Sequence, residues 1–202
     1  HEVSLSEIDG GNLRNAIPRA AHAVIGVHTS KKEDVVAMLN MFVADVEREY
    51  AGLEPTLKIE METAEKPEFA IDSATTMAVI RALYSAPHGV ISMSRELAGL
   101  EETSTNLASV KFEGDDRIVI TTSQRSSVES AKFYAMQTVE SVFALAGAEV
   151  VHSDGYPGWT PDPESKLLEI TVESYRRLFD VKPKVRAIHA GLECGLFLEK
   201  YP

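Results

Sequence analysis

Residues 103–123 read TSTNLASVKFEGDDRIVITTS, and this stretch decides the fold. Two runs that are interpreted as strands, at 103–112 and 117–123, flank the polar residues EGDD at 113–116. Strand-like runs joined by a short polar turn that contains Gly are typical of an antiparallel β-hairpin. The sequence therefore predicts an antiparallel hairpin at this place.

Further strands and helices are expected on both sides of the hairpin. Alternating apolar residues indicate half-buried strands, whereas apolar residues spaced three or four apart indicate amphipathic helices. Side chains at 29–30, 72–73 and 126–127 are candidate helix caps, and Gly147 closes the third helix. The other expected strands are 3–8, 16–27, 57–63, 90–93 and 148–152, and the expected helices are 31–50, 73–84, 127–146 and 164–179. The residues expected to face inward include Val35, Leu39, Phe42, Val43 and Val46 in the first helix, and Met77, Ile80, Leu83 and Tyr84 in the second.

This order of elements predicts an α+β fold in which helices pack on a mostly antiparallel sheet. The Pro- and Gly-rich sequence YPGWTPDP at 156–163 marks a boundary. We expect one domain at 1–154 and a second segment at 155–202, which contains the helix 164–179 and a strand at 185–188.

Composition excludes several classes of function. The chain of 202 residues carries a net charge of −11, which argues against nucleic acid or an anionic membrane as partner. No apolar run is long enough to span a bilayer. Cys194 is the single cysteine, so no internal disulfide can form, and a cytoplasmic location is expected.

Two stretches carry candidate chemistry. IHAGLECGLF at 188–197 follows an apolar run and places Glu193 and Cys194 between two glycines, as a loop at a strand end would present them. In open α/β sheets, ligands gather at the carboxyl ends of strands. The second stretch, EIDGGNLRNAIPR at 7–19, contains a Gly-Gly turn followed by Asn15.

Together with ETSTNL at 102–107, GYPGWTPD at 155–162 and ESYRRLFDVKP at 173–183, these motifs resemble the bacterial aminoacyl-histidine (Xaa-His) dipeptidases, which are dizinc exopeptidases related to carnosinases. The resemblance implies a zinc-dependent enzyme, with two zinc ions, that hydrolyses Xaa-His and other dipeptides. It also implies a lid domain of the split β-α-β, ferredoxin-like type with insertions, followed by a partial α/β catalytic segment.

The metal ligands of that family are expected upstream of residue 1 and downstream of residue 202. The chain is therefore expected to be a fragment with no catalytic residue, no bound zinc and no peptidase activity of its own. Its expected partners are a dipeptide, the remainder of the catalytic domain and a second copy in a homodimer. The alternative is a non-catalytic dimerisation or interaction module.

Three residues of the 1–154 region are candidate substrate contacts. Asn15 resembles the family's Asn before Ile-Pro, which contacts the bound peptide, although an Asn near glycines commonly bonds its own turn. Arg125 resembles the family's Arg at the end of a lid strand and could grip a C-terminal carboxylate, whereas a lone surface Arg is usually solvated. Asn106 lies on a predicted strand that could face the active-site cleft of the enzyme.

The 188–197 motif supplies the remaining candidates. Gly191 and Glu193 correspond to a loop that approaches the substrate in relatives, or they form an ordinary tight turn. His189 could orient the substrate, although a strand-end His is more often structural. A nucleophilic Cys194 would need a paired His, and a buried small hydrophobe is the simpler interpretation. His22, His28, His88 and His152 lack metal-ligand spacing and are expected to be strand and turn residues.

Overall fold

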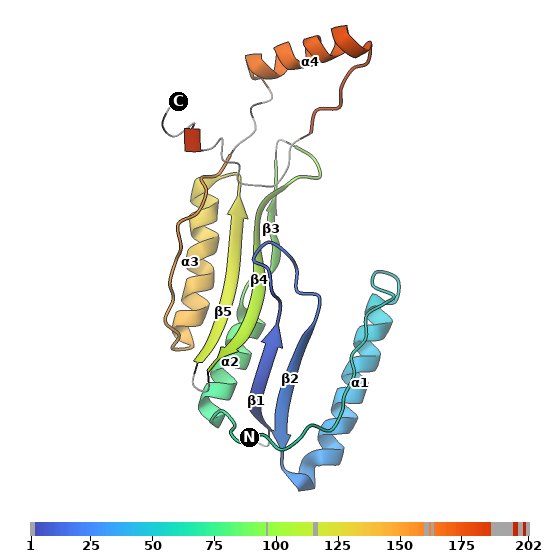
Figure 1. Cartoon of the computed structure of the whole chain (residues 1–202), viewed down its shortest axis with the longest axis vertical. Coiled ribbons are helices and arrows are strands. Elements are labelled where there is room, and N and C mark those ends of the chain that lie inside the picture. Colours follow the sequence, from blue (N-terminus) through green and yellow to red (C-terminus); the bar gives the residue numbers. More distant parts are fainter. Residues whose placement is uncertain are drawn as a thin grey trace.

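The 103–123 stretch forms the predicted antiparallel hairpin (Figure 1), whose first strand is central in the sheet and whose second strand is an edge. The structure is a computed structural model that describes residues 3–95, 97–114, 117–159, 162, 164–186, 196–197 and 200. β4 (Glu101–Glu113) and β5 (Arg117–Ser126) pair antiparallel along their whole shared length, and both are longer than predicted.

Three further strands complete an antiparallel sheet. β1 (Val3–Gly10) pairs with β2 (Ala21–Val27), and β3 (Gly89–Met93) pairs with the first half of β4. β1 joins β4 through a single register pair, Gly10 opposite Val110. Because β5 occupies one edge of β4 throughout, β1 and β3 share the other edge in succession.

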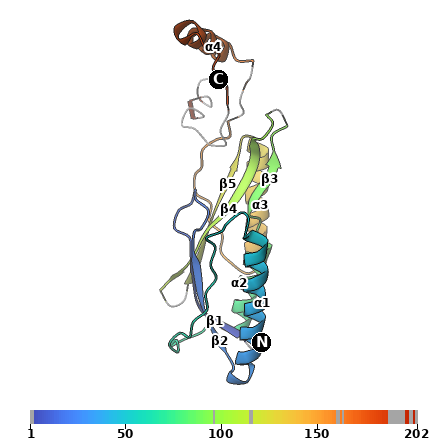
Figure 2. The ribbon, with the colours of Figure 1, turned by 90° about the vertical axis from the view of Figure 1, so that its right-hand side faces the viewer.

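Three helices lie on one side of this sheet (Figure 2), so the predicted α+β fold is confirmed. They leave the opposite side, which we call the open face, without a covering helix. A fourth helix, α4, lies beyond one end of the sheet in every view (Figure 1). The helices are α1 (Lys32–Tyr50), preceded by the short 3-10 helix η1 (Thr29–Lys31), α2 (Ser73–Ser85), α3 (Glu129–Leu145) and α4 (Lys166–Phe179).

The core lies between α2, α3 and the β4–β5 hairpin. Ala82 of α2 packs with Val139 and Phe143 of α3, and Leu107 and Ile120 from β4 and β5 close the cluster from the sheet side. Burial of these apolar groups is the main force that holds α2 and α3 on the sheet.

Two predicted strands are wrong. Residues 57–63 and 148–152 are irregular, and the first five residues of the predicted strand 16–27 form a loop. Alternating apolar residues predict a strand only where a neighbouring strand accepts their backbone hydrogen bonds. Residues 57–63 pair with no described strand and are mostly exposed, whereas Val150 packs instead against the core cluster.

The predicted caps are partly confirmed. Asp72 caps α2, because its Oδ1 accepts hydrogen bonds from the backbone N–H groups of Ala74 (2.9 Å) and Thr75 (3.0 Å). Thr29 belongs instead to η1, and Lys31 precedes α1 without a side-chain cap. Gly147 ends α3 with a φ of 82°, as predicted.

The inward faces of the first two helices also differ from prediction. Ile80 and Tyr84 of α2 are exposed, whereas Thr76 and Ala82 are buried. Small side chains at the contact let α2 approach its neighbours closely, so the buried face follows size as well as polarity. In α1, Phe42 is 57% exposed, and no residue of that helix is fully buried. Among the described residues, no helix is long and apolar enough to cross a membrane.

Candidate substrate-binding site

Arg125 lies near the end of β5 on the open face of the sheet. Its neighbours point the other way, because Gln124 Nε2 donates to Thr105 Oγ1 (3.0 Å) and Ser126 Oγ bonds Thr103 Oγ1 (2.8 Å), and both threonines are buried. Successive strand residues alternate between faces, which directs Arg125 to the open face. Within the part of the chain that the structure describes, no carboxylate forms an ion pair with this half-exposed guanidinium.

Asn106 lies on the same face and holds the loop that contains Asn15. In the β4–β5 register, Asn106 lies opposite Ser123. Ser123 precedes Arg125 by two residues on β5, so the two residues share a face of the sheet. Its Nδ2 donates to the backbone carbonyl of Arg14 (3.0 Å) and to that of Ala16 (2.9 Å). Asn15 therefore sits on a loop segment that is fixed on both sides, with its own side chain exposed.

The start of this loop packs tightly against β4. Gly11 has a φ of 71°, and a Cβ added there would lie 1.9 Å from the carbonyl oxygen of Ala108. Ala108 is the extra residue where the β4–β5 register shifts between Leu107 and Ser109. The loop can reach across the sheet because Gly11 has no side chain.

His88 bonds the backbone of β4 beside the same register shift, a structural role that the sequence did not indicate. Its Nδ1 accepts a hydrogen bond from the backbone N–H of Leu107 at 3.0 Å. Nothing in the spacing of His88 could have signalled this contact, since it depends on the pairing of β3 with β4.

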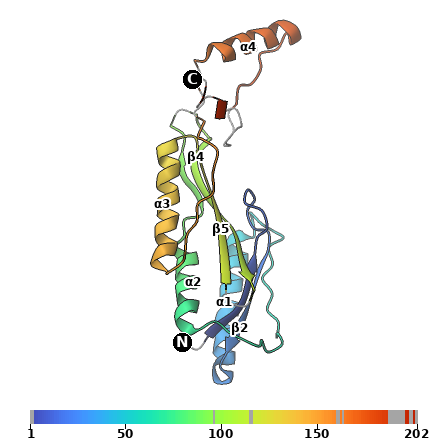
Figure 3. The same cartoon turned by 60° about the vertical axis from the view of Figure 1, so that its left-hand side comes forward.

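Asn15 and Arg125 line the same concavity beside β5, together with Tyr156 and Trp159. We call it the β5 concavity. Its far wall is the return segment, residues 148–159, which runs back beside α3 (Figure 3). The concavity extends along β5 and is also lined by α3. It holds an amide and a guanidinium, the groups that bind a peptide group and a carboxylate.

The return segment is bonded to the first turn of α3. Glu129 accepts a hydrogen bond from the backbone N–H of Gly158 (2.8 Å) and forms an ion pair with Lys132 (2.8 Å). Lys132 Nζ also donates to the carbonyl of Tyr156 (2.7 Å). The hydrogen bond from Lys132, followed by that from Gly158, lowers the pKa of the Glu129 carboxyl.

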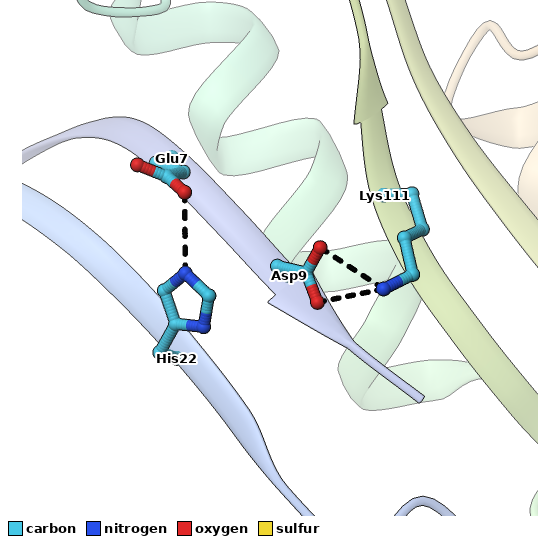
Figure 4. A network of polar contacts seen from close by, with 4 residues as sticks. All are labelled: Glu7, Asp9, His22 and Lys111. Carbon is cyan, nitrogen blue, oxygen red and sulfur yellow. Dashed lines mark hydrogen bonds and ion pairs between the residues drawn. The ribbon is translucent and has the colours of Figure 1, made fainter. Parts of the chain in front are cut away.

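Two further polar contacts lie on β1, as Figure 4 shows. Lys111 Nζ contacts both carboxylate oxygens of Asp9 (2.7 and 3.0 Å), and His22 Nε2 lies 3.1 Å from Glu7 Oε1. The Asp9–Lys111 pair reinforces the place where β1 and β4 share one register pair.

The other predicted site residues, His189, Gly191 and Glu193, lie outside the described residues, as does Cys194. Among those that the structure does describe, no group of three His, Cys, Asp or Glu side chains could hold a metal ion. The described side chains therefore supply no set of ligands for the zinc ions that the resemblance implies.

The described helices and strands form an α+β fold in which helices lie on one side of an antiparallel sheet. The family model described as peptidase dimerisation domain matches residues 1–54, which include β1, β2 and α1.

Comparison with known proteins confirms the predicted resemblance to the aminoacyl-histidine dipeptidases. The chain is 36% identical over 201 residues to the cytosol non-specific dipeptidase of Escherichia coli strain K12, a match that covers 100% of this chain and 41% of that protein. It superposes on the crystal structure of aminoacylhistidine dipeptidase from Vibrio alginolyticus with a TM-score of 0.87 and 33% identity, over 98% of this chain and 40% of the other. The chain thus spans about two fifths of the length of these relatives.

Proposed function

We propose that this chain is the lid and substrate-binding portion of a zinc-dependent dipeptidase that hydrolyses Xaa-His and other dipeptides. The observation that carries this proposal is that Asn15 and Arg125, which are 110 residues apart, line one concavity. The similarity to two dipeptidases along the whole chain supports it.

In this proposal, Arg125 binds the C-terminal carboxylate of the dipeptide. A guanidinium can donate two parallel hydrogen bonds to a carboxylate, and Arg125 has no competing ion pair among the described residues. Asn15 has both a donor and an acceptor for the peptide group, and Asn106 fixes its position. Asn106 Oδ1 is buried and has no described hydrogen-bond partner, so in this proposal Asn106 acts on substrate binding through the position that it gives to Asn15.

His189, Gly191 and Glu193 would complete the site from the 155–202 segment. We assign this segment to the catalytic domain and residues 1–154 to the lid. The exposed apolar residues of α4 support this division, because a helix with no buried residue and a strongly apolar side needs a partner. These residues are Leu167, Ile170, Tyr175, Leu178 and Phe179. We propose the remainder of the catalytic domain as that partner.

The zinc ions, two in the family, would be bound by polypeptide outside this chain, and their chemistry is the activation of a water for attack on the peptide carbonyl. The role of this chain's own residues is to bind and orient the dipeptide and to exclude water when the domains close. The chain alone would then have no peptidase activity. We place the enzyme in the cytoplasm, in keeping with the single cysteine.

A second candidate function, dimerisation, rests on α1. Met38, Met41 and Phe42 lie on one side of this helix and are 61%, 71% and 57% exposed. Helical spacing makes them neighbours, and the match to the peptidase dimerisation domain includes α1. We propose that a second copy of the chain covers this surface.

The test is to compare the 202-residue chain with the product of the complete open reading frame that contains it, each supplied with zinc and Ala-His. We expect hydrolysis by the complete product alone. Hydrolysis by the 202-residue chain would refute the assignment of zinc to other polypeptide. Absence of hydrolysis by both, with a concentration-dependent dimer, would favour a dimerisation module. Loss of hydrolysis after treatment with iodoacetamide would instead indicate that Cys194 acts as the nucleophile.

A further inference from the structure

The return segment runs antiparallel to α3 and contacts it at intervals. Each contact along the segment falls closer to the N-terminus of α3, so the segment ends beside the junction of β5 and α3 (Figure 3). The three contacts are His152 with Glu140 (3.1 Å), Tyr156 with Lys132 (2.7 Å) and Gly158 with Glu129 (2.8 Å).

The last two contacts share one ion pair. Lys132, whose side chain is only 22% exposed, bonds both the Glu129 carboxylate and the carbonyl of Tyr156. Glu129 in turn accepts the backbone N–H of Gly158. Removal of the Glu129 carboxylate would therefore free Gly158 and leave Lys132 with one bond fewer.

Gly158 also touches the residues that directly follow Arg125. A Cβ added at Gly158 would lie 3.0 Å from the carbonyl oxygen of Ser127 and 3.1 Å from that of Ser126. The backbone next to Trp159 is thus packed against the backbone next to Arg125. Trp159 is half-buried and lines the β5 concavity, as Arg125 and Asn15 do.

We propose that Glu129 and Lys132 are positioning residues that hold the return segment against the end of β5, so that Trp159 forms the wall on which the side chain of the substrate's C-terminal residue packs. This inference rests on the proposed function, because it places the carboxylate of the same residue on Arg125. An indole ring packs better on a flat aromatic or imidazole side chain than on glycine, whose side chain is a hydrogen atom. Trp159 would therefore select among dipeptides by their second residue.

The first test uses the 202-residue chain. Trp159 is its single tryptophan, so fluorescence excited selectively at tryptophan reports on this segment alone. We expect Glu129→Ala to raise acrylamide quenching of Trp159 roughly twofold, through local opening. The matched control, Glu33→Ala, removes a carboxylate from the first turn of α1 and should leave quenching unchanged. Equal quenching in Glu129→Ala and the parent chain would overturn the positioning role.

The second test uses the complete enzyme and the ratio of kcat/KM for Ala-His to that for Ala-Gly. Trp159→Ala should lower this ratio by roughly three- to tenfold, with Trp159→Phe retaining most of it. Gly158→Ala, which must displace the segment, should shift the ratio in the same direction.

The outcomes separate the two proposals. An unchanged ratio in a folded, active Trp159→Ala enzyme would overturn the inference and leave the proposed function standing. A parent enzyme that hydrolyses neither dipeptide would overturn the proposed function and the selectivity of Trp159 together.

Discussion

The side-chain amide of Asn106 bonds the backbone on both sides of Asn15, through the carbonyls of Arg14 at 3.0 Å and Ala16 at 2.9 Å. A residue of β4 therefore sets the position of a loop that lies about ninety residues earlier in the chain. Both N–H groups of Asn106 are directed to this task, so its contribution to substrate binding is chiefly indirect.

We predict that Asn106→Asp destabilises the protein by about 1–3 kcal/mol, because the donor group is lost and a carboxylate faces two carbonyl oxygens. Urea unfolding measures the change, and amide hydrogen exchange at 12–17 should increase beyond the global effect. Asn12→Asp is the control, since Asn12 is exposed on the same loop. Equal stability of the two variants would contradict the role of Asn106.

We predict that Gly11→Ala is destabilising by at least about 1 kcal/mol, because alanine is strained at a φ of 71° and its Cβ would overlap the carbonyl of Ala108. Gly52→Ala is a matched change with no atom within 4 Å of the added Cβ, and should be close to neutral. Thermal unfolding of both variants provides the comparison. Similar melting temperatures would show that the loop does not approach β4 in this way.

The β4–β5 hairpin could be predicted from sequence because its signals are local: two strand-like runs and a polar turn. The strand predicted at 57–63 shows the limit of that reasoning, since its alternating residues have no described strand beside them. Alternation records that one side of a segment is apolar, whereas a strand also needs a hydrogen-bonding neighbour. Likewise, the buried face of α2 depends on the sheet and on α3, which helical spacing cannot reveal.

The candidate site also combines residues that could be predicted from the sequence with contacts that could not. Asn15 and Arg125 could be selected from a family resemblance, but their presence on one concavity depends on the register of β4 and β5. The roles of Glu129 and Gly158 depend on where the return segment runs, which the incorrectly predicted strand at 148–152 did not anticipate. Residue types were therefore easier to predict than the contacts that position them.

We predict that Arg125→Lys in the complete enzyme raises KM for dipeptides at least about tenfold, because an ammonium cannot reproduce the two parallel hydrogen bonds of a guanidinium. Steady-state kinetics with Ala-His measures this. Arg117→Lys, at the other end of β5, is the control for a general effect of charge on that strand. Unchanged KM and kcat in Arg125→Lys would refute the carboxylate contact.

We predict that the cap at Asp72 makes stability depend on pH in the acid range. Hydrogen bonds from Thr75, and a further bond from the Ala74 backbone, lower the pKa of Asp72 below its ordinary value of 3.8. A lowered pKa in the folded state means that the stabilisation is complete above the unfolded value and is lost as pH falls through the folded one. The stability difference between the parent chain and Asp72→Asn should thus be constant near neutral pH and shrink below 3.8. A difference that stays constant in urea titrations down to acid pH would contradict this account.

The exposed apolar side of α1 gives the prediction for assembly. Phe42 is 57% exposed and neighbours Met38 and Met41, so Phe42→Asp should cost little in the folded monomer while it places a charge within the proposed contact. We expect the dissociation constant of the dimer to increase at least about tenfold, as measured by sedimentation over a range of concentrations. Tyr84→Asp is the matched control, because Tyr84 is 93% exposed on α2 and lies outside this surface. If the two variants dissociate alike, or if Phe42→Asp remains as dimeric as the parent, a surface other than α1 mediates the association.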